Sequence, residues 1–320
     1  MDVSIVVPVY NEFESLPLLH EKISKALTTI DRSWEVIFVD DGSRDISLEV
    51  LEEIAVQDPV HVRVLSFRRN FGQTTAIAAG IDHSEGSVIV MIDADLQNDP
   101  ADIPMLLDKL DEGYDLVSGW RVSRQDKFIT RTLPSRIANG LISYVTGVKL
   151  HDYGCSLKAY RREVLTGFRL YGEMHRFIPA YASSVGAKII EVPVQHHPRK
   201  FGKAKYGLER TLKVTLDLFT VKYLISYSQK PIYIFGSVGI GLIFLSFLDI
   251  LYLILRRLLI GEHMIRSPLL QMGTMLFVMG FNSILLGLIA EQLMRTYHEA
   301  QAKPTYTLLK KINISEEVES

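Results

Sequence analysis

Two long apolar runs near the end of the chain constrain its architecture most strongly. They occupy residues 232–255 and 269–290 of the 320-residue sequence, and Asp249 is the one charged residue within them. Each run exceeds the roughly 20 residues that cross a hydrocarbon core of about 30 Å. The runs therefore predict two membrane-spanning helices, and the alternative is a buried helical hairpin of a soluble core.

Two spans would place both ends of the chain on the same side of the membrane. The N-terminal "MDVSIVVPVYNE" lacks a basic n-region and a small-residue cleavage site, so it reads as a strand and not as a signal peptide. We expect the large N-terminal domain and both termini to lie in the cytosol, at the inner (cytoplasmic) membrane. Asp249 and Asn282, inside the runs, predict hydrogen bonds between helices or to a neighbouring subunit, or else a lipid-headgroup path.

Up to about residue 122 the chain alternates apolar strand-like runs with helical patterns. The strand-like runs cover residues 3–10, 34–41, 62–67, 87–95 and 114–121. This alternation predicts an α/β fold with a mostly parallel sheet that is covered on both faces. In such sheets ligands bind beyond the carboxyl ends of the strands.

The composition argues against nucleic-acid binding and excludes an intrachain disulfide. Lys plus Arg number 35 and Asp plus Glu number 37, and this balance argues against general nucleic-acid binding. Cys155 is the single cysteine, so an intrachain disulfide cannot form.

The strand-like run that ends in "IDADLQ" leads into carboxylates that a core would not hold. Asp93 and Asp95 are two residues apart, so in a strand they would point the same way, about 6–7 Å from each other. A hard divalent cation, Mg²⁺ or Mn²⁺, would relieve their repulsion, and Gln97 could complete the ligand set. A lone D-x-D also occurs by chance. Asp99, before Pro100, is expected to cap a helix.

The cluster "VDDGS" follows the second strand-like run. Gly42 and Ser43 suit a tight turn, with Ser43 opening the next helix. Asp40 or Asp41 could accept hydrogen bonds from a base or a ribose, whereas turn and cap chemistry alone leaves two adjacent acids unexplained.

Taken in order and spacing, "PVYNE", "DDGS" and "DADLQ" resemble a family 2 glycosyltransferase with the GT-A (Rossmann-like) fold. Downstream, "HDYGCSLKAYRREVL" and "RKFGKAKYGLER", followed by two spans, resemble the polyprenyl-phosphate glycosyltransferases. These include dolichol-phosphate mannose synthases, polyprenyl-phosphate glucosyltransferases and undecaprenyl-phosphate aminoarabinose transferases. The resemblance extends to about Thr307.

The resemblance implies a nucleotide site, a metal site, an acceptor site and a set of catalytic residues. It assigns the nucleotide to Pro8, Tyr10, Asn11, Glu12, Asp40, Asp41 and Asp93. It assigns Mg²⁺ or Mn²⁺ to Asp93, Asp95 and Gln97. It assigns the acceptor phosphate to Arg121, Arg131, Ser135, Lys158, Arg199, Lys203 and Lys205. It assigns catalysis to Asp95, Asp152, Arg131 and Arg199.

Three of these assignments stay open at this point. Asp152 matches an acid of mannose-type members, but its role as a base is not fixed. Lys158 stands where many members have an arginine, and the two are not interchangeable at a bidentate phosphate site. The basic stretch that contains Arg199, Lys203 and Lys205 could equally meet anionic lipid headgroups.

The reaction that the resemblance implies is inverting, metal-dependent transfer of a sugar from a UDP- or GDP-linked donor to undecaprenyl or dolichyl phosphate. The alternatives are a non-catalytic lipid-carrier-binding or flippase-associated membrane protein, and a transferase that acts on another membrane lipid. A processive polysaccharide synthase would have Q-x-x-R-W and more spans, whereas here Thr296 follows Arg295. Family analogy also suggests a homo-oligomer, a tetramer.

These observations divide the chain into four parts. Residues 1–205 would form the GT-A domain, and residues 230–292 the two-helix transmembrane domain. Residues 206–229, with apolar side chains at helical spacing, would form a juxtamembrane amphipathic helix at the interface; a soluble core helix is the rival reading. Residues 293–320 would be a cytosolic tail with an acidic, disordered end.

Overall fold

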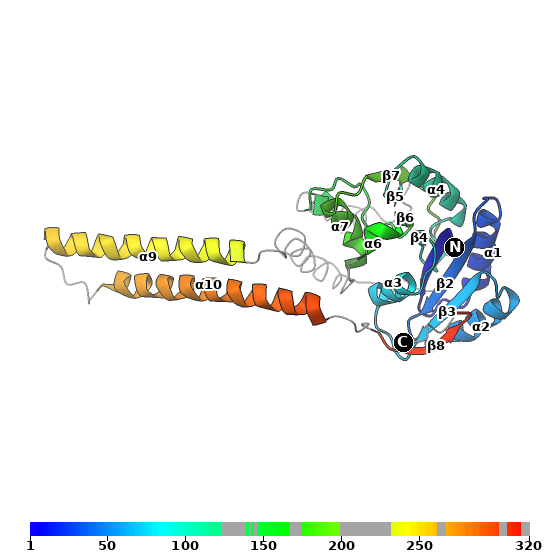
Figure 1. Ribbon diagram of the computed structural model, residues 1–320, viewed down its shortest axis with the longest axis horizontal. Coiled ribbons are helices and arrows are strands. Elements are labelled where there is room, and N and C mark those ends of the chain that lie inside the picture. The colour runs from blue at the N-terminus through cyan, green and yellow to red at the C-terminus, as the bar shows by residue number, and fades with distance from the viewer. Residues whose placement is uncertain are drawn as a thin grey trace. The chain divides into compact units, whose positions relative to one another are not determined.

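A computed structural model gives the arrangement of the chain (Figure 1). It describes residues 1–122, 139–140, 142–143, 146–166, 174–198, 232–260, 267–300 and 306–314. The chain forms two compact units. The first comprises Met1–Val221 and Pro304–Ser320, and the second comprises Lys222–Lys303.

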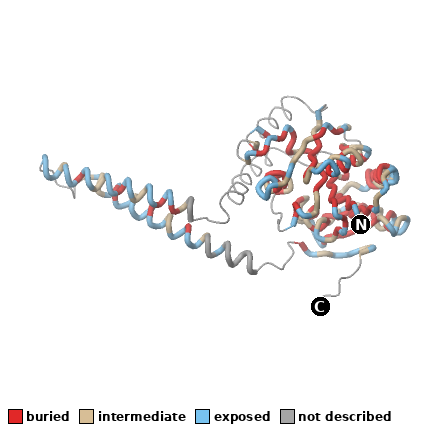
Figure 2. The backbone as a smooth tube through the Cα atoms, turned by 45° about the horizontal axis from the view of Figure 1, so that its top comes forward, coloured by how far each residue is buried: buried red, intermediate tan, exposed pale blue. Residues whose placement is uncertain are grey.

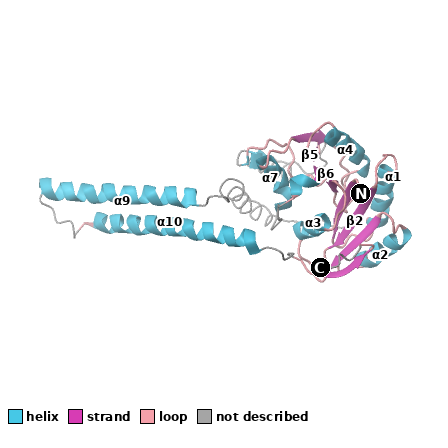
Figure 3. Cartoon of the chain, viewed as in Figure 1, coloured by secondary structure: helices cyan, strands magenta, loops and turns pink. Residues whose placement is uncertain are grey.

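The first unit is built on a mixed sheet (Figure 3). Its strands are β1 (Val3–Val9), β2 (Trp34–Asp40), β3 (Val62–Phe67), β4 (Val88–Met91), β5 (Leu116–Trp120), β6 (Lys158–Arg161), β7 (Ile189–Pro193) and β8 (Leu308–Ile312). Their order across the sheet is β7-β5-β6-β4-β1-β2-β3-β8. β6 and β8 run antiparallel to their neighbours, and the other neighbouring strands are parallel. The predicted α/β fold with a mostly parallel sheet is confirmed.

Helices cover both faces of this sheet. The described ones are α1 (Leu16–Leu27), α2 (Ser47–Gln57), α3 (Gln73–Asp82), α4 (Ile103–Asp111), α6 (Arg162–Leu165) and α7 (Ile178–Ser184), with 3₁₀ turns η1 (Pro100–Asp102) and η3 (Met174–Phe177). In β2, Trp34, Val36 and Phe38 pack in the core formed with α1, α2 and α4, whereas Ile37 and Val39 pack with α3. This two-sided burial, visible along the strands in Figure 2, explains why the strands are apolar almost throughout.

A glycine lets α3 pack closely on the sheet. A Cβ atom added to Gly80 would lie 2.3 Å from Cγ1 of Val6 in β1. Because α3 lies this close, Gln73 at its first turn reaches the segment that follows β4, where its Nε2 donates to Asp93 Oδ1 at 2.8 Å. The fold thus places a helix start beside the carboxyl end of the central strands.

The ends of several elements differ from the sequence-based expectation. β4 ends at Met91, so Asp93 and Asp95 lie after the strand and not within it. α2 begins at Ser47, and Ser43 does not cap it; the backbone N–H of Ser47 is instead bound by Asp45 Oδ1 at 3.0 Å. The expected cap at Asp99 is confirmed, because its Oδ1 accepts from the backbone N–H of Ala101 at 3.1 Å.

The end of the chain returns to the sheet. β8 pairs with β3 along the edge of the sheet, so Leu308–Ile312 is ordered structure of the first unit. Residues 293–320 were expected to form a cytosolic tail, and within this range Leu308–Ile312 forms a strand of the first unit. Apolar Leu308 and Ile312 pack against the core, and a short strand gives no long-range signal in the sequence. Residues 315–320 lie outside the described residues.

The second unit is a pair of long antiparallel helices, α9 (Ile232–Ile260) and α10 (Pro268–Ala300). Phe235–Ile260 and Pro268–Ala290 are long and apolar enough to cross a membrane, and only 17% of each apolar window is buried within the protein. A core helix of a soluble protein would bury most of such a surface. The hairpin therefore fits the predicted pair of spans, and Figure 2 shows that many of its residues are exposed. The predicted amphipathic helix over residues 206–229 lies outside the described residues.

Small residues bring α9 and α10 together. A Cβ atom on Gly239 would lie 2.6 Å from the carbonyl oxygen of Gly280, so the backbones approach as closely as glycine permits. Ser246 Oγ donates to the carbonyl oxygen of Gly273 at 2.7 Å. Asp249 faces the same glycine, since a Cβ there would lie 2.5 Å from its Oδ2.

Candidate active site

The sheet brings the polar clusters of the sequence to one edge. β1, β2, β3 and β4 are parallel, so the segments that follow them emerge on the same side. β6 is antiparallel to β4, so the segment that precedes it, which contains Asp152, emerges there as well. Pro8 pairs with Val39 in the sheet, and Tyr10 follows β1; both are half-buried at this edge.

Asp41 joins two of the segments at this edge. The residue is buried, and its Oδ1 accepts a hydrogen bond from the backbone N–H of Phe71 at 2.6 Å while its Oδ2 accepts one from Gly72 at 2.9 Å. Burial raises the pKa of Asp41 to about 6, although these two hydrogen bonds oppose the increase. Asp41 therefore fixes the loop after β3 and still holds lone pairs for a further donor.

Asp40, the last residue of β2, is also buried. Its Oδ2 accepts from Ser66 Oγ at 3.0 Å, and its Oδ1 accepts from the backbone N–H of Ser43 at 3.2 Å. Burial raises the pKa of Asp40, and the hydrogen bonds from the two serines oppose this. Gly42 follows with a φ of 64°, the positive value expected for a tight turn.

The loops after β1 and β2 hold each other in place. The backbone N–H of Asn11 donates to Ser43 Oγ at 2.9 Å, and Asn11 Oδ1 accepts from the backbone N–H of Arg44 at 2.8 Å. The backbone N–H of Glu12 donates to Ser47 Oγ at 2.9 Å. Asn11 has a φ of 52°, a left-handed conformation that asparagine tolerates better than most residues. Ser43 thus serves the loop after β1 instead of a helix start.

Asp93 and Asp95 lie in the turn after β4. Asp93 Oδ1 is held by Gln73, and Asp95 Oδ1 accepts from the backbone N–H of Gln97 at 3.1 Å. Between them and Gln97, the buried Leu96 adopts a φ of 60°. The spacing expected for two residues of one strand therefore does not apply, and the two carboxylates are instead placed by a turn and by α3.

The donor set at this turn fits a hard divalent ion that is shared with a ligand. Asp93 and Asp95 offer carboxylate oxygens, and no group of three or more His, Cys, Asp or Glu side chains that could hold a metal occurs among the described residues. An ion bound here would need further oxygens, which Mg²⁺ and Mn²⁺ take from a diphosphate and water. A closed site of the zinc type is not indicated by these residues.

Arg121 and Asp152 form a bidentate ion pair that the sequence did not predict. Arg121 Nε donates to Asp152 Oδ2 at 2.7 Å, and Arg121 Nη2 donates to Oδ1 at 2.9 Å. Burial opposes the charge of Arg121, but the hydrogen bonds and the charge of Asp152 outweigh it and raise the pKa of Arg121. The backbone N–H of Asp152 in turn donates to Glu191 Oε1 at 2.9 Å. The pair holds the end of β5 to the segment before β6.

This pairing changes the role expected for Asp152 and leaves the one expected for Arg121. The carboxylate of Asp152 is used to hold a partly buried guanidinium, which does not suit a general base. Arg121 uses two of the five N–H donors of a guanidinium in the pair, and the others can still face an anion. Arg121 therefore stays a proposed acceptor contact, whereas Asp152 becomes its orienting partner.

Lys158, at the start of β6, lies in an environment different from the one expected. It is buried, and its Nζ donates to the backbone carbonyl oxygens of Tyr153, at 3.3 Å, and Cys155. Burial lowers the pKa of Lys158. Its ammonium group is used to fix the turn that precedes β6, so we do not retain Lys158 as an acceptor contact.

The segment after β7 lies along the turn that follows β4. Asn98 and His196 form an isolated antiparallel bridge, and the backbone N–H of His197 donates to the carbonyl oxygen of Gln97 at 2.8 Å. His197 Nε2 lies 2.8 Å from Asp99 Oδ2. The chain therefore leaves β7 beside the carboxylate turn, immediately before the basic stretch of the sequence.

Five of the predicted site residues lie outside the described residues. They are Arg131, Ser135, Arg199, Lys203 and Lys205. Conversely, sequence reasoning missed the residues that orient the site: Gln73, Ser66, Glu191 and His197. Each acts on a partner that is 20 to 98 residues away in the sequence, so no local pattern could have found it. His197, two residues before Arg199 in "HHPRK", had the nearest signal.

Comparison with known proteins identifies the family. The model of glycosyl transferase family 2 matches residues 4–168, a range that runs from the second residue of β1 to beyond β6. The chain belongs to glycosyl transferase family 2. The protein is therefore a glycosyltransferase with a GT-A-like fold, and the resemblance stated from the sequence motifs is confirmed.

Relatives within family 2 act on polyprenyl phosphates according to their names. The chain is 42% identical over 309 residues to the dodecaprenyl-phosphate galacturonate synthase of Rhizobium johnstonii, covering 96% of this chain and 91% of that protein. It is 39% identical over 305 residues to the undecaprenyl-phosphate 4-deoxy-4-formamido-L-arabinose transferase of Klebsiella pneumoniae, covering 95% of this chain and 91% of that protein.

A solved structure of another protein shares the fold. Glucosyl-3-phosphoglycerate synthase from Mycobacterium tuberculosis, in complex with Mn²⁺, uridine diphosphate and phosphoglyceric acid, superposes with a TM-score of 0.52. The sequences are 19% identical, and the match covers 70% of this chain and 78% of that one.

Proposed function

We propose that the protein transfers a sugar from a nucleoside diphosphate sugar to a polyprenyl phosphate at the cytosolic face of the membrane, with inversion at the anomeric carbon. The observation that supports this most directly is the convergence at one sheet edge of the Asp40–Asp41 turn, the Asp93–Asp95 turn and the segment that leads into the basic stretch. The two relatives named for polyprenyl-phosphate acceptors support the choice of acceptor.

Different residues would bind different parts of the donor. Asp40, bound to Ser43 and Ser66, and Asp41, bound to the loop after β3, would receive the donor's base or ribose. Asp93 and Asp95 would hold the diphosphate together with Mg²⁺ or Mn²⁺, a Lewis acid that offsets the charge of the leaving diphosphate when bound. Gln73 keeps the Asp93 carboxylate oriented for this task.

The acceptor needs little help from a base. A phosphomonoester has a second pKa near 6, so a lipid phosphate is largely ionised at neutral pH. The protein must instead bring two anions together and exclude water, which is work for guanidinium groups. Arg121 is held for this role by Asp152, and Arg131 and Arg199 take it from the family resemblance. Attack of the phosphate oxygen on the face opposite the diphosphate inverts the anomeric centre.

The hairpin of α9 and α10 would anchor this site to the membrane that contains the acceptor. Both termini and the catalytic unit would then share the cytosolic side. The basic residues Lys203 and Lys205 would meet the acceptor or the anionic headgroups around it. A homo-oligomer stays a prediction.

The deciding experiment is a donor panel with membranes that contain the full-length protein. UDP-galacturonate, UDP-4-deoxy-4-formamido-L-arabinose, UDP-glucose, UDP-galactose and GDP-mannose, each labelled in the sugar, are offered with undecaprenyl phosphate and Mn²⁺. We expect label in one lipid product from one donor. No transfer from any donor, combined with no nucleotide binding, would contradict the proposal and favour a non-catalytic lipid-carrier-binding role.

A matched pair of variants tests the metal assignment. Asp95→Ala removes a proposed ligand and should abolish transfer at every donor concentration, since the diphosphate loses its counter-charge. Asp31 is an exposed acid that is not part of the proposed site, so Asp31→Ala should leave the rate unchanged. Near-normal transfer by Asp95→Ala would show that the metal assignment at this turn is wrong.

A further inference from the structure

The last described strand of the chain lies beside the strand that leads into the nucleotide pocket. β8 pairs with β3 in antiparallel register, with Val64 opposite Ile312 and Phe67 opposite Leu308. The pairing is irregular between Ser66 and Phe67, where β3 ends. The segment that precedes β8 therefore reaches the same sheet edge as the polar clusters.

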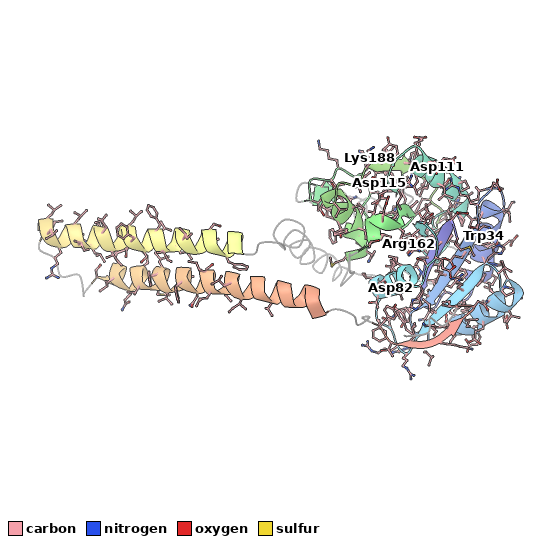
Figure 4. All side chains as sticks on the ribbon, viewed as in Figure 1. Trp34, Asp82, Asp111, Asp115, Arg162 and Lys188 are labelled. Carbon is pink, nitrogen blue, oxygen red and sulfur yellow. The ribbon has the colours of Figure 1, made fainter. Side chains whose placement is uncertain are left out.

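Tyr306 anchors this segment to the face of the sheet that α3 covers. Its side chain is buried and stacks on Phe67, with ring centroids 5.3 Å apart and an interplanar angle of 20°. Its hydroxyl donates to Asp82 Oδ2 at 3.1 Å, and Asp82 is seen on α3 in Figure 4. A residue near the chain's end thus completes a core cluster of the catalytic sheet.

The same contacts continue into the loop after β3. The backbone N–H of Arg68 donates to the carbonyl oxygen of Thr307 at 3.2 Å. Phe71 packs edge-on against Phe67, with ring centroids 5.6 Å apart. The loop of residues 68–72 is therefore held at its start by the segment before β8 and at its end by the ring that Tyr306 stacks on.

This loop forms one wall of the Asp41 site. The backbone N–H groups of Phe71 and Gly72 bind the two oxygens of Asp41. The loop also lies directly against the turn after β2, since a Cβ atom on Gly42 would be 2.4 Å from the carbonyl carbon of Arg69. A shift of the loop would therefore move the carboxylate or leave it without its hydrogen bonds.

We infer that the segment before β8, through Tyr306 and Thr307, positions the loop of residues 68–72 and thereby sets the affinity for the donor's nucleotide, with Tyr306 as the positioning residue. This inference rests on the proposed function, because it assumes that Asp41 faces a nucleotide. It adds that the affinity of this site depends on a segment that follows both apolar helices in the sequence.

The test compares three substitutions in the full-length protein. Tyr306→Leu keeps an apolar side chain but removes ring stacking and the hydroxyl. Tyr306→Phe keeps the ring and removes the hydroxyl, which contacts Asp82 and His83. Leu309→Ala is the control, since Leu309 lies in the same strand with 54% of its surface exposed.

The dissociation constant for UDP or GDP, whichever the wild type binds, and the KM values for donor and acceptor are measured for each. Loss of one aromatic contact corresponds to about 3- to 10-fold in an equilibrium constant. We expect Tyr306→Leu to raise the nucleotide Kd and the donor KM by about this factor, with kcat and the acceptor KM unchanged. Tyr306→Phe should stay within about twofold of wild type because the stacking is retained, and Leu309→Ala should equal wild type.

Hydrogen exchange separates positioning from general loss of stability. In Tyr306→Leu the amides of residues 68–72 should exchange faster while those of β1 and β2 do not change. A uniform rise in exchange, or a fall in kcat with an unchanged donor KM, would overturn the inference. Wild-type protein that binds neither nucleotide would overturn the proposed function with it, whereas normal binding by Tyr306→Leu would overturn the inference alone.

Discussion

Asp41 is a carboxyl group that titrates close to neutral pH. Burial raises its pKa from 3.8 to about 6, so the group takes up a proton as the pH falls through 6. A base N–H donates more strongly to the ionised form, because a charged acceptor makes a stronger hydrogen bond than a protonated carboxyl group. We expect the affinity for uridine or guanosine to fall about tenfold between pH 7 and pH 5. Nucleosides are the right probes because they contain no titrating phosphate.

Asp41→Asn supplies the control for this pH dependence. The amide keeps the shape but cannot titrate, so the variant should bind weakly and with no change between pH 7 and pH 5. A wild-type affinity that is flat over this range would show that Asp41 does not contact the base.

Thermal stability can show whether Asp152 acts as the partner of Arg121 or as a catalytic base. Asp152→Asn leaves a partly buried guanidinium without its counter-charge, and breaking such a pair costs about 3–5 kcal/mol. We expect a marked drop in the midpoint of thermal unfolding, together with lost transfer. If Asp152 were instead a base, the midpoint would stay unchanged and only the rate and its pH profile would alter.

At this scale the sequence predicted where polar groups lie but not what they bind. The positive φ of Gly42 and the cap at Asp99 depend on their immediate neighbours, and both were predicted. The partner of Arg121 is 31 residues away, and the carbonyl groups around Lys158 belong to a turn that no motif encodes. Pairings of this kind depend on the tertiary fold.

Among the elements, the glycine contacts of the hairpin allow a sharp prediction. Gly280→Leu would force a side chain against Ile243 and the carbonyl oxygen of Gly239, and overpacking of this kind costs about 1–3 kcal/mol. We expect a lower thermal midpoint of the detergent-solubilised protein. Gly241→Leu is the matched control, because a Cβ atom on Gly241 meets nothing within 4 Å. Equal midpoints for the two variants would contradict the close packing of α9 on α10.

Helices and strands were predictable from the sequence where burial gives their apolar residues a regular spacing or an unbroken run. β1 to β5 are apolar because both faces are covered, and α1 and α4 show one apolar stripe each. β8 was not predicted, since five residues of mixed character gain their stability only from pairing with β3, which precedes it by 240 residues or more in sequence. Strand ends were overestimated where apolar residues continue into a turn, as after β4.

For the whole molecule, the two-span topology can be tested by labelling introduced cysteines, because the single native cysteine should not react. Cys155 is buried, and burial raises the pKa of its thiol to about 11, so maleimide should not label it at neutral pH. We expect Asp2→Cys and His263→Cys to be labelled from opposite faces of sealed membrane vesicles. Labelling of both from one face would show that the hairpin does not cross the membrane.

The position of β8 has a consequence for how the protein is made. The edge of the catalytic sheet is completed by residues that leave the ribosome after both apolar helices. Chains are synthesised from the N-terminus, and domains generally fold as they emerge. Here the first unit can fold its central strands early, but its last strand pairs only once the hairpin has been synthesised. A chain cut short within the hairpin would lack Tyr306 and β8, so by the inference drawn above it would bind a donor nucleotide weakly.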